Sequence, residues 1–372
     1  MGYPYKSNEY VFVKQLIDEM VDLGENVTVI SPQSITNYLL RNKLKKPYKT
    51  TIASQNRTYQ LYSPKYLTFS KIPIFKNLSK FHYQQSIILT IKKNAIDFDF
   101  VYAHFIDGPG TTAYKIFKKH RKPYFIALGE SSFSFKISRK LKNTIEKCRG
   151  FIAVSSEMKQ RLISSFENID VSKILLKPNG YNRKRFFPIA GNELRQSLGL
   201  KDSDFVVIFV GSFIHRKGPL RLSEALKKLH NPNVKAIFIG SGPQEPSYEG
   251  IVFKGLVKHE YVNTYLNAAD VFVLPTLNEG SCNAIVEAMA TGLAIVSSVN
   301  EFNDDLLDDS FALRIDPNSI DDIYEAINYL LENPIVLARM RENAIVKSES
   351  FILDKRAKDI IEFITNVGLH DD

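Results

Sequence analysis

The chain has 372 residues, of which 44% are hydrophobic and 24% charged; these are ordinary proportions for a soluble protein, and the length favours two domains over a single core. No apolar run reaches the 18 residues that suggest a membrane-spanning helix, and the opening MGYPYKSNEY lacks the apolar segment of a signal peptide, so neither a spanning helix nor export is expected. The formal net charge of +9 is unevenly divided, since residues 1–190 hold 32 Lys and Arg against 13 Asp and Glu, whereas residues 191–372 hold 17 against 27.

The first half of the chain predicts a parallel sheet covered by helices. Residues 9–23 place apolar side chains on one helical face, and residues 26–31 form a buried strand. The strands and helices that follow alternate along the chain: strands at 100–105, 123–128 and 150–156, and helices at 111–119 and around 134–147. Short apolar strands joined by helices are typical of a parallel sheet that is buried on both faces.

A linker is predicted at residues 177–188. Pro178-Asn179-Gly180 is a strong turn signal, and Pro188 closes the segment. This division gives a first domain of residues 1–186 and a second of residues 187–349. The closing helix, within residues 350–372, is expected to pack back on the first domain.

The second half predicts another sheet of the same kind. Its strands are expected at 204–212, 234–242, 250–255, 270–275 and 293–298, and its helices at 219–229, 259–268, 283–291, 320–332 and 352–366. The fold class is therefore α/β, with two doubly wound, Rossmann-like domains that face each other across a cleft. Ligands of such sheets bind at the carboxyl ends of the strands, so the residues that follow each strand are the candidate site.

One window of the first half combines basic and aromatic residues. No acidic residue lies between Glu25 and Asp97, and this window contains twelve Lys and Arg and nine aromatic residues. Three interpretations fit: a solvated basic face, contact with single-stranded nucleic acid, or docking on an anionic membrane surface, where each nearby cation contributes about 1 kcal/mol. We expect the third, through residues 36–93, and no nucleic-acid partner.

The cysteines and one acidic triplet bear on metal binding. Cys148 and Cys282 form no ligand-spaced set, which fits a reducing compartment such as the cytoplasm and excludes a cysteine-built zinc site. Asp97-Phe98-Asp99 has the acid-x-acid pattern that holds a metal in GT-A transferases, but it precedes a predicted strand, whereas a metal-binding triplet should follow one. We therefore expect no divalent metal and no cofactor.

Two carboxylates, Glu279 and Glu287, follow the strand at 270–275. Paired acids can cleave a glycosidic bond, or they can grip the hydroxyl groups of a sugar; a solvent-facing Glu279 and a salt-bridged Glu287 would fit equally well. If the helix starts near residue 281, the pair lies up to about 12 Å apart at 1.5 Å per residue. This separation exceeds the roughly 5–9.5 Å of glycosidase pairs, so a clamp on one long ligand is the better interpretation.

Other strand ends carry glycine and positive charge. Gly280 allows close backbone approach at a helix start, where free N–H groups attract anions. After the strand at 204–212, Gly211 is followed by Arg216 and Lys217, a pair that would neutralise a diphosphate. Gly240 belongs to Gly-Ser-Gly, a fragment of a dinucleotide-binding fingerprint and a weak signal by itself.

Together these residues resemble the retaining glycosyltransferases of family 4, also called group 1, which have the GT-B fold. The resemblance covers residues from about 99 to 345, and its most specific parts are NEGSCNAIVEAMATGLAIV, AADVFVLP, VGSFIHRKG and PNGYNRKRF. It implies that Glu279 holds the donor sugar, Glu287 binds the ribose hydroxyls, and Arg216 and Lys217 hold the diphosphate. Further donor contacts are then expected at these positions: Gly211, Gly240, Gly280, Ser281 and Cys282.

The resemblance extends to the first domain. VYAHFIDGPG is similar to the segment whose histidine faces the donor sugar, which implies a catalytic role for His104, although a core histidine would also fit. PYFIALGES implies acceptor contacts at Gly129 and Glu130, and the phosphate-loop position of the family reads Ser7-Asn8. The chain starts where the family has passed its first strand, so the first domain is expected to lack that strand.

The resemblance implies a retaining enzyme that moves a hexose from a UDP- or GDP-sugar to a hydroxyl of a glycan; we expect it to be metal-independent and its acceptor to be lipid-linked. Its place would be bacterial cell-surface polysaccharide synthesis, such as lipopolysaccharide or capsule, at the inner face of the cell membrane. Two alternatives stay open: an inactive relative that binds a nucleotide sugar or glycan without turnover, and a basic nucleic-acid-binding protein.

Overall fold

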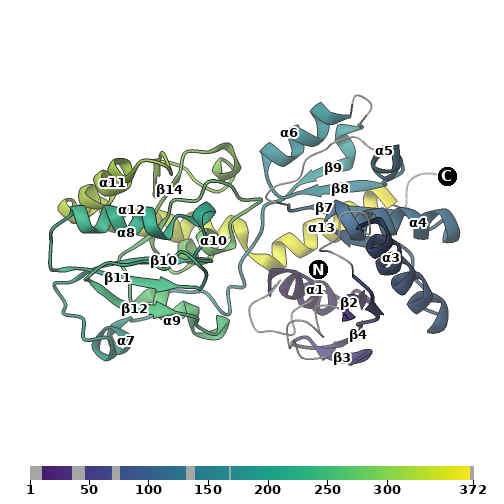
Figure 1. Ribbon diagram of the computed structural model, residues 1–372, viewed down its shortest axis with the longest axis horizontal. Helices are drawn as coiled ribbons and strands as arrows, with labels where there is room; N and C mark the ends of the chain where they lie inside the picture. Colours follow the sequence, from purple (N-terminus) through teal and green to yellow (C-terminus); the bar gives the residue numbers. More distant parts are fainter. Residues whose placement is uncertain (1–10, 36–46, 69–75, 131–138, 167–168, 369–372) are drawn as a thin grey trace.

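The computed structural model describes residues 11–35, 47–68, 76–130, 139–166 and 169–368. Figure 1 shows two lobes, the amino-terminal domain and the carboxy-terminal domain, joined by the chain near residue 180 and by the last helix. Each lobe contains a parallel sheet with helices packed against it, so the predicted two-domain α/β fold is confirmed.

The described part of the amino-terminal domain contains three separate sheets. One is fully parallel, in the order β6-β7-β8-β9; a second has the order β1-β4-β3, with β1 parallel and β3 antiparallel to β4; the third pairs β2 with β5 in parallel. Its strands are β1 (Thr28–Ile30), β2 (Gln33–Ser34), β3 (Lys49–Ala53), β4 (Thr58–Tyr62), β5 (Lys65–Tyr66), β6 (Val101–His104), β7 (Tyr124–Leu128), β8 (Gly150–Ala153) and β9 (Ile174–Leu176). Its helices are α1 (Val11–Asp22), α3 (Lys76–Lys93), α4 (Thr111–His120), α5 (Arg139–Glu146) and α6 (Ser156–Ser165), with short turns η2 (Ile106–Gly110) and η3 (Val171–Lys173).

Within the described residues, no strand pairs with both β1 and β6. Apolar side chains connect the two sheets instead, because Ile30 of β1 and Val101 of β6 pack on the same cluster as Ile87 and Ile91 of α3. The halves of this domain are therefore held together by helix packing where strand pairing is absent.

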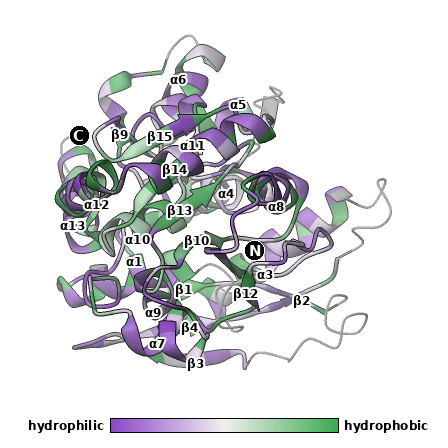
Figure 2. Ribbon diagram, turned by 90° about the vertical axis from the view of Figure 1, so that its left-hand side faces the viewer, coloured by the Kyte–Doolittle hydropathy of each residue, from purple (hydrophilic) through white to green (hydrophobic). Residues whose placement is uncertain are grey.

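The carboxy-terminal domain has one six-stranded parallel sheet in the order β12-β11-β10-β13-β14-β15. Its strands are β10 (Phe205–Val210), β11 (Val234–Ile239), β12 (Ile251–Gly255), β13 (Val271–Leu274), β14 (Ala294–Ser298) and β15 (Ala312–Ile315). Its helices are α7 (Asn192–Ser197), α8 (Pro219–Lys228), α9 (Val262–Asn267), α10 (Asn283–Ala290), α11 (Ile320–Glu332) and α12 (Pro334–Ser348), with short turns η4 (His215–Lys217), η5 (His259–Tyr261), η6 (Glu301–Asn303) and η7 (Glu349–Phe351). Figure 2 shows the central strands as hydrophobic and the rim helix α7 as mostly hydrophilic, which is the pattern of a sheet buried on both faces.

The chain crosses between the domains twice, and the two crossings touch. Tyr181 on the first crossing pairs with Ile352 on the second in a short parallel bridge, and the Tyr181 N–H donates to the Phe351 carbonyl at 2.9 Å. A Cβ on Gly180 would lie 2.7 Å from that same carbonyl oxygen, so glycine is required for this approach. The second crossing leads into α13 (Leu353–Gly368), whose Ala357 and Ile360 join the apolar cluster of the amino-terminal domain.

Candidate active site

Glu279 lies in the loop after β13, and one oxygen of its carboxylate contacts three donor side chains. Its Oε1 accepts a hydrogen bond from Thr276 Oγ1 at 2.9 Å and lies 3.0 Å from Arg216 Nη1, and Lys217 Nζ contacts the same oxygen. The side chains of Glu279 and Lys217 are only 10% and 13% exposed, so these charges compensate one another inside the protein. Three residues that the sequence predicted for one site are thus in contact.

The loops that carry these residues are tied together by backbone. Arg216 and Lys217 lie in η4, which ends at Gly218 with φ of 77°, a left-handed conformation that favours glycine. A Cβ on Gly218 would lie 2.5 Å from the Pro275 carbonyl oxygen, in the loop after β13. The N–H of Leu277 donates to the Arg216 carbonyl at 2.8 Å, so a backbone hydrogen bond joins the loops that follow β10 and β13.

Two other predicted glycines allow adjacent strand ends to touch. Gly240 follows β11 with φ of 153°, and a Cβ there would lie 1.9 Å from the carbonyl oxygen of Gly211, which follows β10. The Gly211 N–H in turn donates to the Ile239 carbonyl at 2.9 Å. Both glycines therefore have a packing role, and their contact with a donor stays a prediction.

Glu287 lies on α10 and is held by a histidine that the sequence did not single out. His259 Nε2 lies 3.1 Å from Glu287 Oε1, and the two side chains are 19% and 12% exposed. His259 follows β12, at the carboxyl edge of the same sheet, in the turn η5. Its place shortly after a strand was the available signal, but its partner is 28 residues away along the chain.

The start of α10 differs from the expectation. The helix begins at Asn283, with Cys282 as its N-cap, so Glu279 lies in the preceding loop and the spacing of the carboxylates is not purely helical. Ser281 is already engaged, because its Oγ accepts from the Asn179 N–H at 3.0 Å and its carbonyl accepts from Asn179 Nδ2 at 3.2 Å. Burial raises the pKa of the Cys282 thiol to about 11 against the opposing effect of Lys217, so this thiol stays protonated at neutral pH.

Gly280 marks where the two domains meet. A Cβ on Gly280 would lie 2.6 Å from the carbonyl oxygen of Gly129, which follows β7 in the amino-terminal domain. These two residues were predicted for the donor and acceptor sides of one site. The structure brings them into contact across the domain interface.

A carboxylate also joins the domains at the start of α6. Asp305, after η6, accepts hydrogen bonds from the N–H of Ser156 at 2.5 Å and from its hydroxyl at 2.6 Å. Ser156 is the first residue of α6, so the carboxylate binds where the helix dipole favours negative charge. No local sequence pattern marks this pair, since its members lie 149 residues apart.

His104 ends β6 and has an apolar and aromatic environment. Its ring lies 5.4 Å from Phe12 and 4.6 Å from Phe105, centroid to centroid. Among the described residues its Nδ1 is buried without a hydrogen-bond partner. Burial, with a smaller effect from the Arg356 guanidinium, lowers the pKa of His104 to about 3, so the ring is neutral at physiological pH. Arg356 is itself buried and donates from Nε to the Pro178 carbonyl at 2.7 Å.

Glu130 is held by backbone rather than exposed to a ligand. Its Oε1 accepts from the Ile106 N–H at 2.6 Å, and its Oε2 accepts from the Gly129 N–H at 3.1 Å. Burial raises the pKa of Glu130, while these hydrogen bonds oppose the shift. Glu130 thus fixes the loop that follows His104, and its predicted acceptor contact stays a prediction. Ser7 and Asn8 lie outside the described residues.

The acidic triplet lies away from the strand ends. Asp97 and Asp99 are exposed and precede β6, and Asp97 accepts from the Phe98 N–H at 2.9 Å. In the described part of the chain, His, Cys, Asp and Glu side chains form no group of three or more that could hold a metal ion. Nor do the described helices include one that is both long and apolar enough to cross a membrane.

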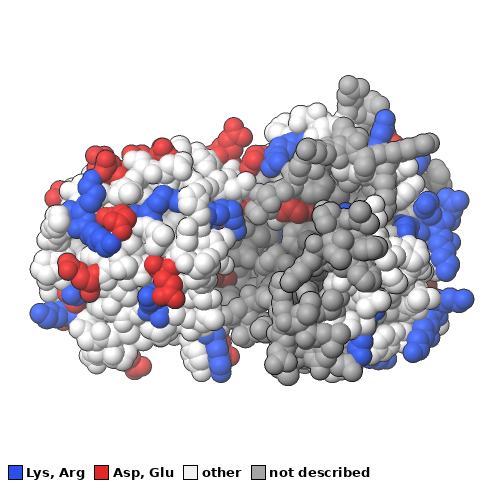
Figure 3. All heavy atoms as spheres, in the orientation of Figure 1, with Lys and Arg blue, Asp and Glu red and all other residues white. Residues whose placement is uncertain are grey.

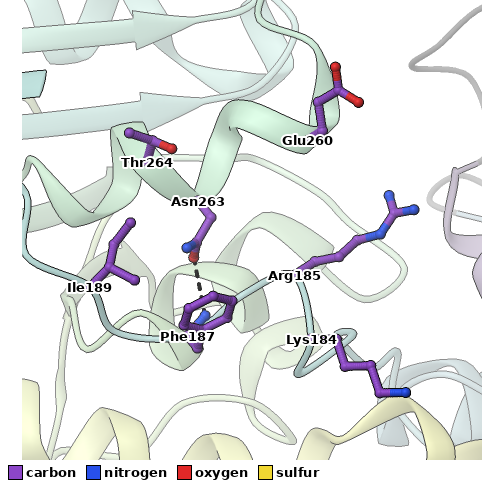
Figure 4. A pocket seen from close by; sticks show the side chains of 7 residues that line it. All are labelled: Lys184, Arg185, Phe187, Ile189, Glu260, Asn263 and Thr264. Carbon is purple, nitrogen blue, oxygen red and sulfur yellow. Dashed lines mark hydrogen bonds between the residues drawn. The ribbon is translucent and has the colours of Figure 1, made fainter.

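A groove of about 410 Å³ lies beside the linker, between residues 184–189 and α9. Figure 4 shows Arg185 and Lys184 on one side and Glu260 on the other, with the Phe187 N–H bonded to Asn263 Oδ1 at 3.1 Å. The groove contains none of the predicted donor-site residues. The candidate site is therefore assigned to the strand ends around Glu279 and Glu287.

Known proteins resemble this chain in sequence and in fold. The chain is 28% identical over 340 residues to a Bacillus subtilis protein named as the teichuronic acid biosynthesis glycosyltransferase TuaC, covering 87% of this chain and 85% of that protein. It is 30% identical over 218 residues to the UDP-Gal:alpha-D-GlcNAc-diphosphoundecaprenol alpha-1,3-galactosyltransferase of Escherichia coli, covering 53% and 56%. A sucrose-phosphate synthase from Thermosynechococcus elongatus shares the fold with a TM-score of 0.78 at 17% identity, over 96% of this chain and 92% of that one.

The family model of glycosyl transferases group 1 matches residues 191–347, the segment that carries Arg216, Lys217, Glu279 and Glu287. The relatives named above are glycosyltransferases by name, and the solved structure has the same two-domain architecture. Residues 191–347 therefore match the group 1 glycosyltransferase family, and the chain as a whole has the GT-B fold.

Proposed function

We propose that this protein is a retaining glycosyltransferase that moves a hexose from a UDP- or GDP-sugar to a hydroxyl of a lipid-linked glycan. The observation that carries the proposal is the convergence of Arg216 and Lys217 on Glu279 at the strand ends of the second domain. Glu287 lies on the helix that follows. This arrangement offers cations for a diphosphate and two carboxylates for hydroxyl groups of the same ligand.

Arg216 and Lys217 would stabilise the leaving diphosphate. As the bond between the sugar C1 and the phosphate oxygen breaks, negative charge accumulates on the phosphate, and preorganised donors at such a position contribute about 10²–10³ in rate. In the structure both cations contact Glu279, whose single negative charge compensates the buried Lys217, while Arg216 is 35% exposed. With cations in this role, transfer needs no divalent metal.

The sugar would lie between Glu279 and His104. A neutral histidine with an unpartnered nitrogen suits an uncharged hydroxyl group better than a phosphate. In the proposed step, the acceptor oxygen bonds to C1 on the face that the leaving phosphate departs from, and the acceptor proton passes to the leaving phosphate oxygen. The anomeric configuration is then retained, and domain closure at Gly280 and Gly129 would exclude water.

The relatives support the substrate classes. The Escherichia coli protein is named for a UDP-galactose donor and a diphosphoundecaprenol-linked acceptor, and the Bacillus subtilis protein for teichuronic acid, a bacterial polysaccharide. We assign the same classes to this chain, a nucleoside diphosphate sugar and a lipid-linked glycan of a bacterial surface polysaccharide. The reaction would take place on the cytoplasmic face of the membrane.

The amino-terminal domain carries a surface suited to that membrane. Three apolar side chains of α3, Leu78, Phe81 and Leu89, are exposed, and their spacing places them on one face of the helix. Lys115 Nζ lies 5.7 Å from the centre of the Phe81 ring, and Lys93 Nζ lies 5.3 Å from that of Tyr48. On the side shown in Figure 3, Lys and Arg gather at the outer edge of this domain. Exposed apolar groups beside cations suit an anionic lipid surface.

The experiment on function is a thermal-shift screen with UDP-glucose, UDP-galactose and GDP-mannose, followed by transfer to a lipid-linked acceptor. A donor at 100 times its Kd should stabilise the protein by about 2.7 kcal/mol. NMR of the product should show the anomeric configuration of the donor, and EDTA should leave the rate unchanged. If neither the nucleotide sugars nor their products UDP and GDP stabilise the protein, the proposal is overturned.

Membrane docking is tested separately by co-sedimentation with lipid vesicles. The wild-type protein should sediment with vesicles that contain phosphatidylglycerol and stay in solution with pure phosphatidylcholine. The double variant Leu78→Asp, Phe81→Asp should lose this binding and keep its stabilisation by the nucleotide sugar. Equal binding to both kinds of vesicle, or full binding by the variant, would contradict the assigned surface.

A further inference from the structure

His259 and Glu287 form a polar contact within the sheet edge assigned to the donor. His259 Nε2 and Glu287 Oε1 are 3.1 Å apart, and neither side chain is more than 19% exposed. An ionised carboxylate only accepts hydrogen bonds, so the proton of this contact belongs to the imidazole Nε2. In the neutral ring, Nδ1 then carries a lone pair.

Two buried polar atoms beside this contact lack a partner. In the described part of the chain, neither His259 Nδ1 nor Asn283 Oδ1 has a hydrogen-bond partner. Asn283 and Glu287 lie four residues apart on α10, which places them on the same side of the helix. Buried acceptors without partners are costly, so this face of α10 is suited to a ligand that brings hydroxyl or N–H groups.

The histidine ring is oriented by the linker. Phe186 packs edge-on against it, with ring centroids 5.3 Å apart, and Phe186 is only 1% exposed. Of the two ring nitrogens, Nε2 contacts Glu287, and Nδ1 has no partner among the described residues. The ring therefore has a fixed direction relative to the carboxylate.

We propose that His259 is a positioning residue of the donor site: its Nε2–H fixes the Glu287 carboxylate in the orientation that binds the ribose hydroxyls of a nucleoside diphosphate. The proposal rests on the proposed function, which assigns Glu287 to the nucleotide. It adds a residue from η5, on a different strand end, to the site formed by the loop after β13 and the helix α10. The affinity for the nucleoside part of the donor then depends on the hydrogen bond between His259 and Glu287, although neither residue of that bond belongs to the ligand.

The test compares three substitutions of His259 by calorimetric titration with UDP and GDP. The amide of Gln can place an N–H near the position of Nε2, whereas the shorter Asn cannot reach it, and Ala offers no donor. For whichever nucleotide the wild type binds, His259→Ala and His259→Asn should raise Kd about tenfold, as expected for a hydrogen bond worth about 1.4 kcal/mol. His259→Gln should stay within about threefold of the wild type by the same conversion. His120→Ala, at the end of α4, is the control for histidine removal.

A double-mutant cycle with Glu287→Ala separates this proposal from the function on which it rests. If His259 acts through Glu287, His259→Ala should cause no further loss in the Glu287→Ala background. Equal affinity of His259→Ala and wild type, with a clear loss for Glu287→Ala, would overturn the positioning role and leave the proposed function standing. Equal losses for Gln, Asn and Ala would also overturn it, because a merely structural histidine would give that result. Wild-type affinity of Glu287→Ala would overturn both.

Discussion

The two sides of the domain interface differ in how their polar side chains are satisfied. On the carboxy-terminal side, the Glu279 carboxylate contacts Arg216, Lys217 and Thr276. The Glu287 carboxylate contacts His259. On the amino-terminal side, His104 has aromatic neighbours and, within the described residues, no partner for Nδ1. Under the proposed function, the carboxy-terminal domain would therefore hold the charged part of a donor, and the neutral His104 of the amino-terminal domain would contact only its uncharged sugar.

The largest expected effect comes from removing charge on the carboxy-terminal side. Lys217→Met should lower kcat for sugar transfer by about 10²–10³, because one cation would no longer stabilise the leaving diphosphate. Steady-state kinetics measure this loss. Lys227→Met is the matched control, since that lysine of α8 pairs with Glu224 on the surface and should keep full activity. A Lys217→Met rate within threefold of the wild type would show that the positive charge of Lys217 does not contribute to catalysis.

The interface itself is probed by adding one methyl group. In Gly280→Ala the new Cβ would lie 2.6 Å from the Gly129 carbonyl oxygen, too close for the domains to meet as they do. Transfer should fall by about tenfold or more, as misplacement of a site by about 1 Å is known to cost about 10²-fold. Gly368→Ala at the end of α13 is the control, because its Cβ would make only an ordinary contact of 3.6 Å with Phe125. Equal rates for both variants would argue against a closed interface during transfer.

Asp305→Ala removes the carboxylate that joins the domains at α6. Two hydrogen bonds to a charged group are lost, and the free energy of unfolding should fall by about 1.5–3 kcal/mol. Urea unfolding measures the change, with Asp309→Ala on the exposed surface of the same domain as control. Unchanged stability would mean that the first turn of α6 finds other partners when the carboxylate is absent.

The smallest expected effect concerns the neutral histidine of the amino-terminal side. Because the pKa of His104 is lowered to about 3 in the folded protein, the unfolded chain binds the proton more readily between about pH 6.5 and pH 3. Stability therefore falls as the pH drops below about 6.5, by at most about 1.4 kcal/mol per pH unit from this residue. His104→Gln should show a shallower fall in unfolding free energy between pH 7 and pH 5. An identical slope in both proteins would place His104 in a solvated site.

The donor side was largely predictable from local signals. Gly240 and Gly280 occupy close backbone approaches, and Arg216, Lys217 and Glu279 follow buried strands whose apolar residues are plain in the sequence. Parallel strand ends share one edge of a sheet, so proximity of these residues follows from topology alone. The contacts among them confirm that expectation of proximity, while their roles toward a ligand stay predictions.

The rest depended on tertiary structure. Helix α3 was not predicted because Leu78, Phe81 and Leu89 are exposed while Ile87 and Ile91 are buried, so no single apolar stripe marks it. Strands β3 and β4 pair in a part of the chain for which only the basic and aromatic residues were interpreted. His259 and Asp305 were missed because their partners lie 28 and 149 residues away, and no local pattern reports such distances.

The central claim is that Glu279 and Glu287 hold different parts of one donor, and calorimetric titration of UDP and UDP-glucose, or of GDP and GDP-mannose, tests it most directly. Glu287→Ala should weaken the binding of the nucleotide and of the nucleotide sugar by the same factor of about ten, because both ligands carry the ribose. Glu279→Ala should lower the affinity for the nucleotide sugar. Its affinity for the nucleotide alone should be unchanged or higher, because Arg216 and Lys217 lose their internal partner. Equal losses of both ligands in Glu279→Ala, or wild-type binding in Glu287→Ala, would contradict the account.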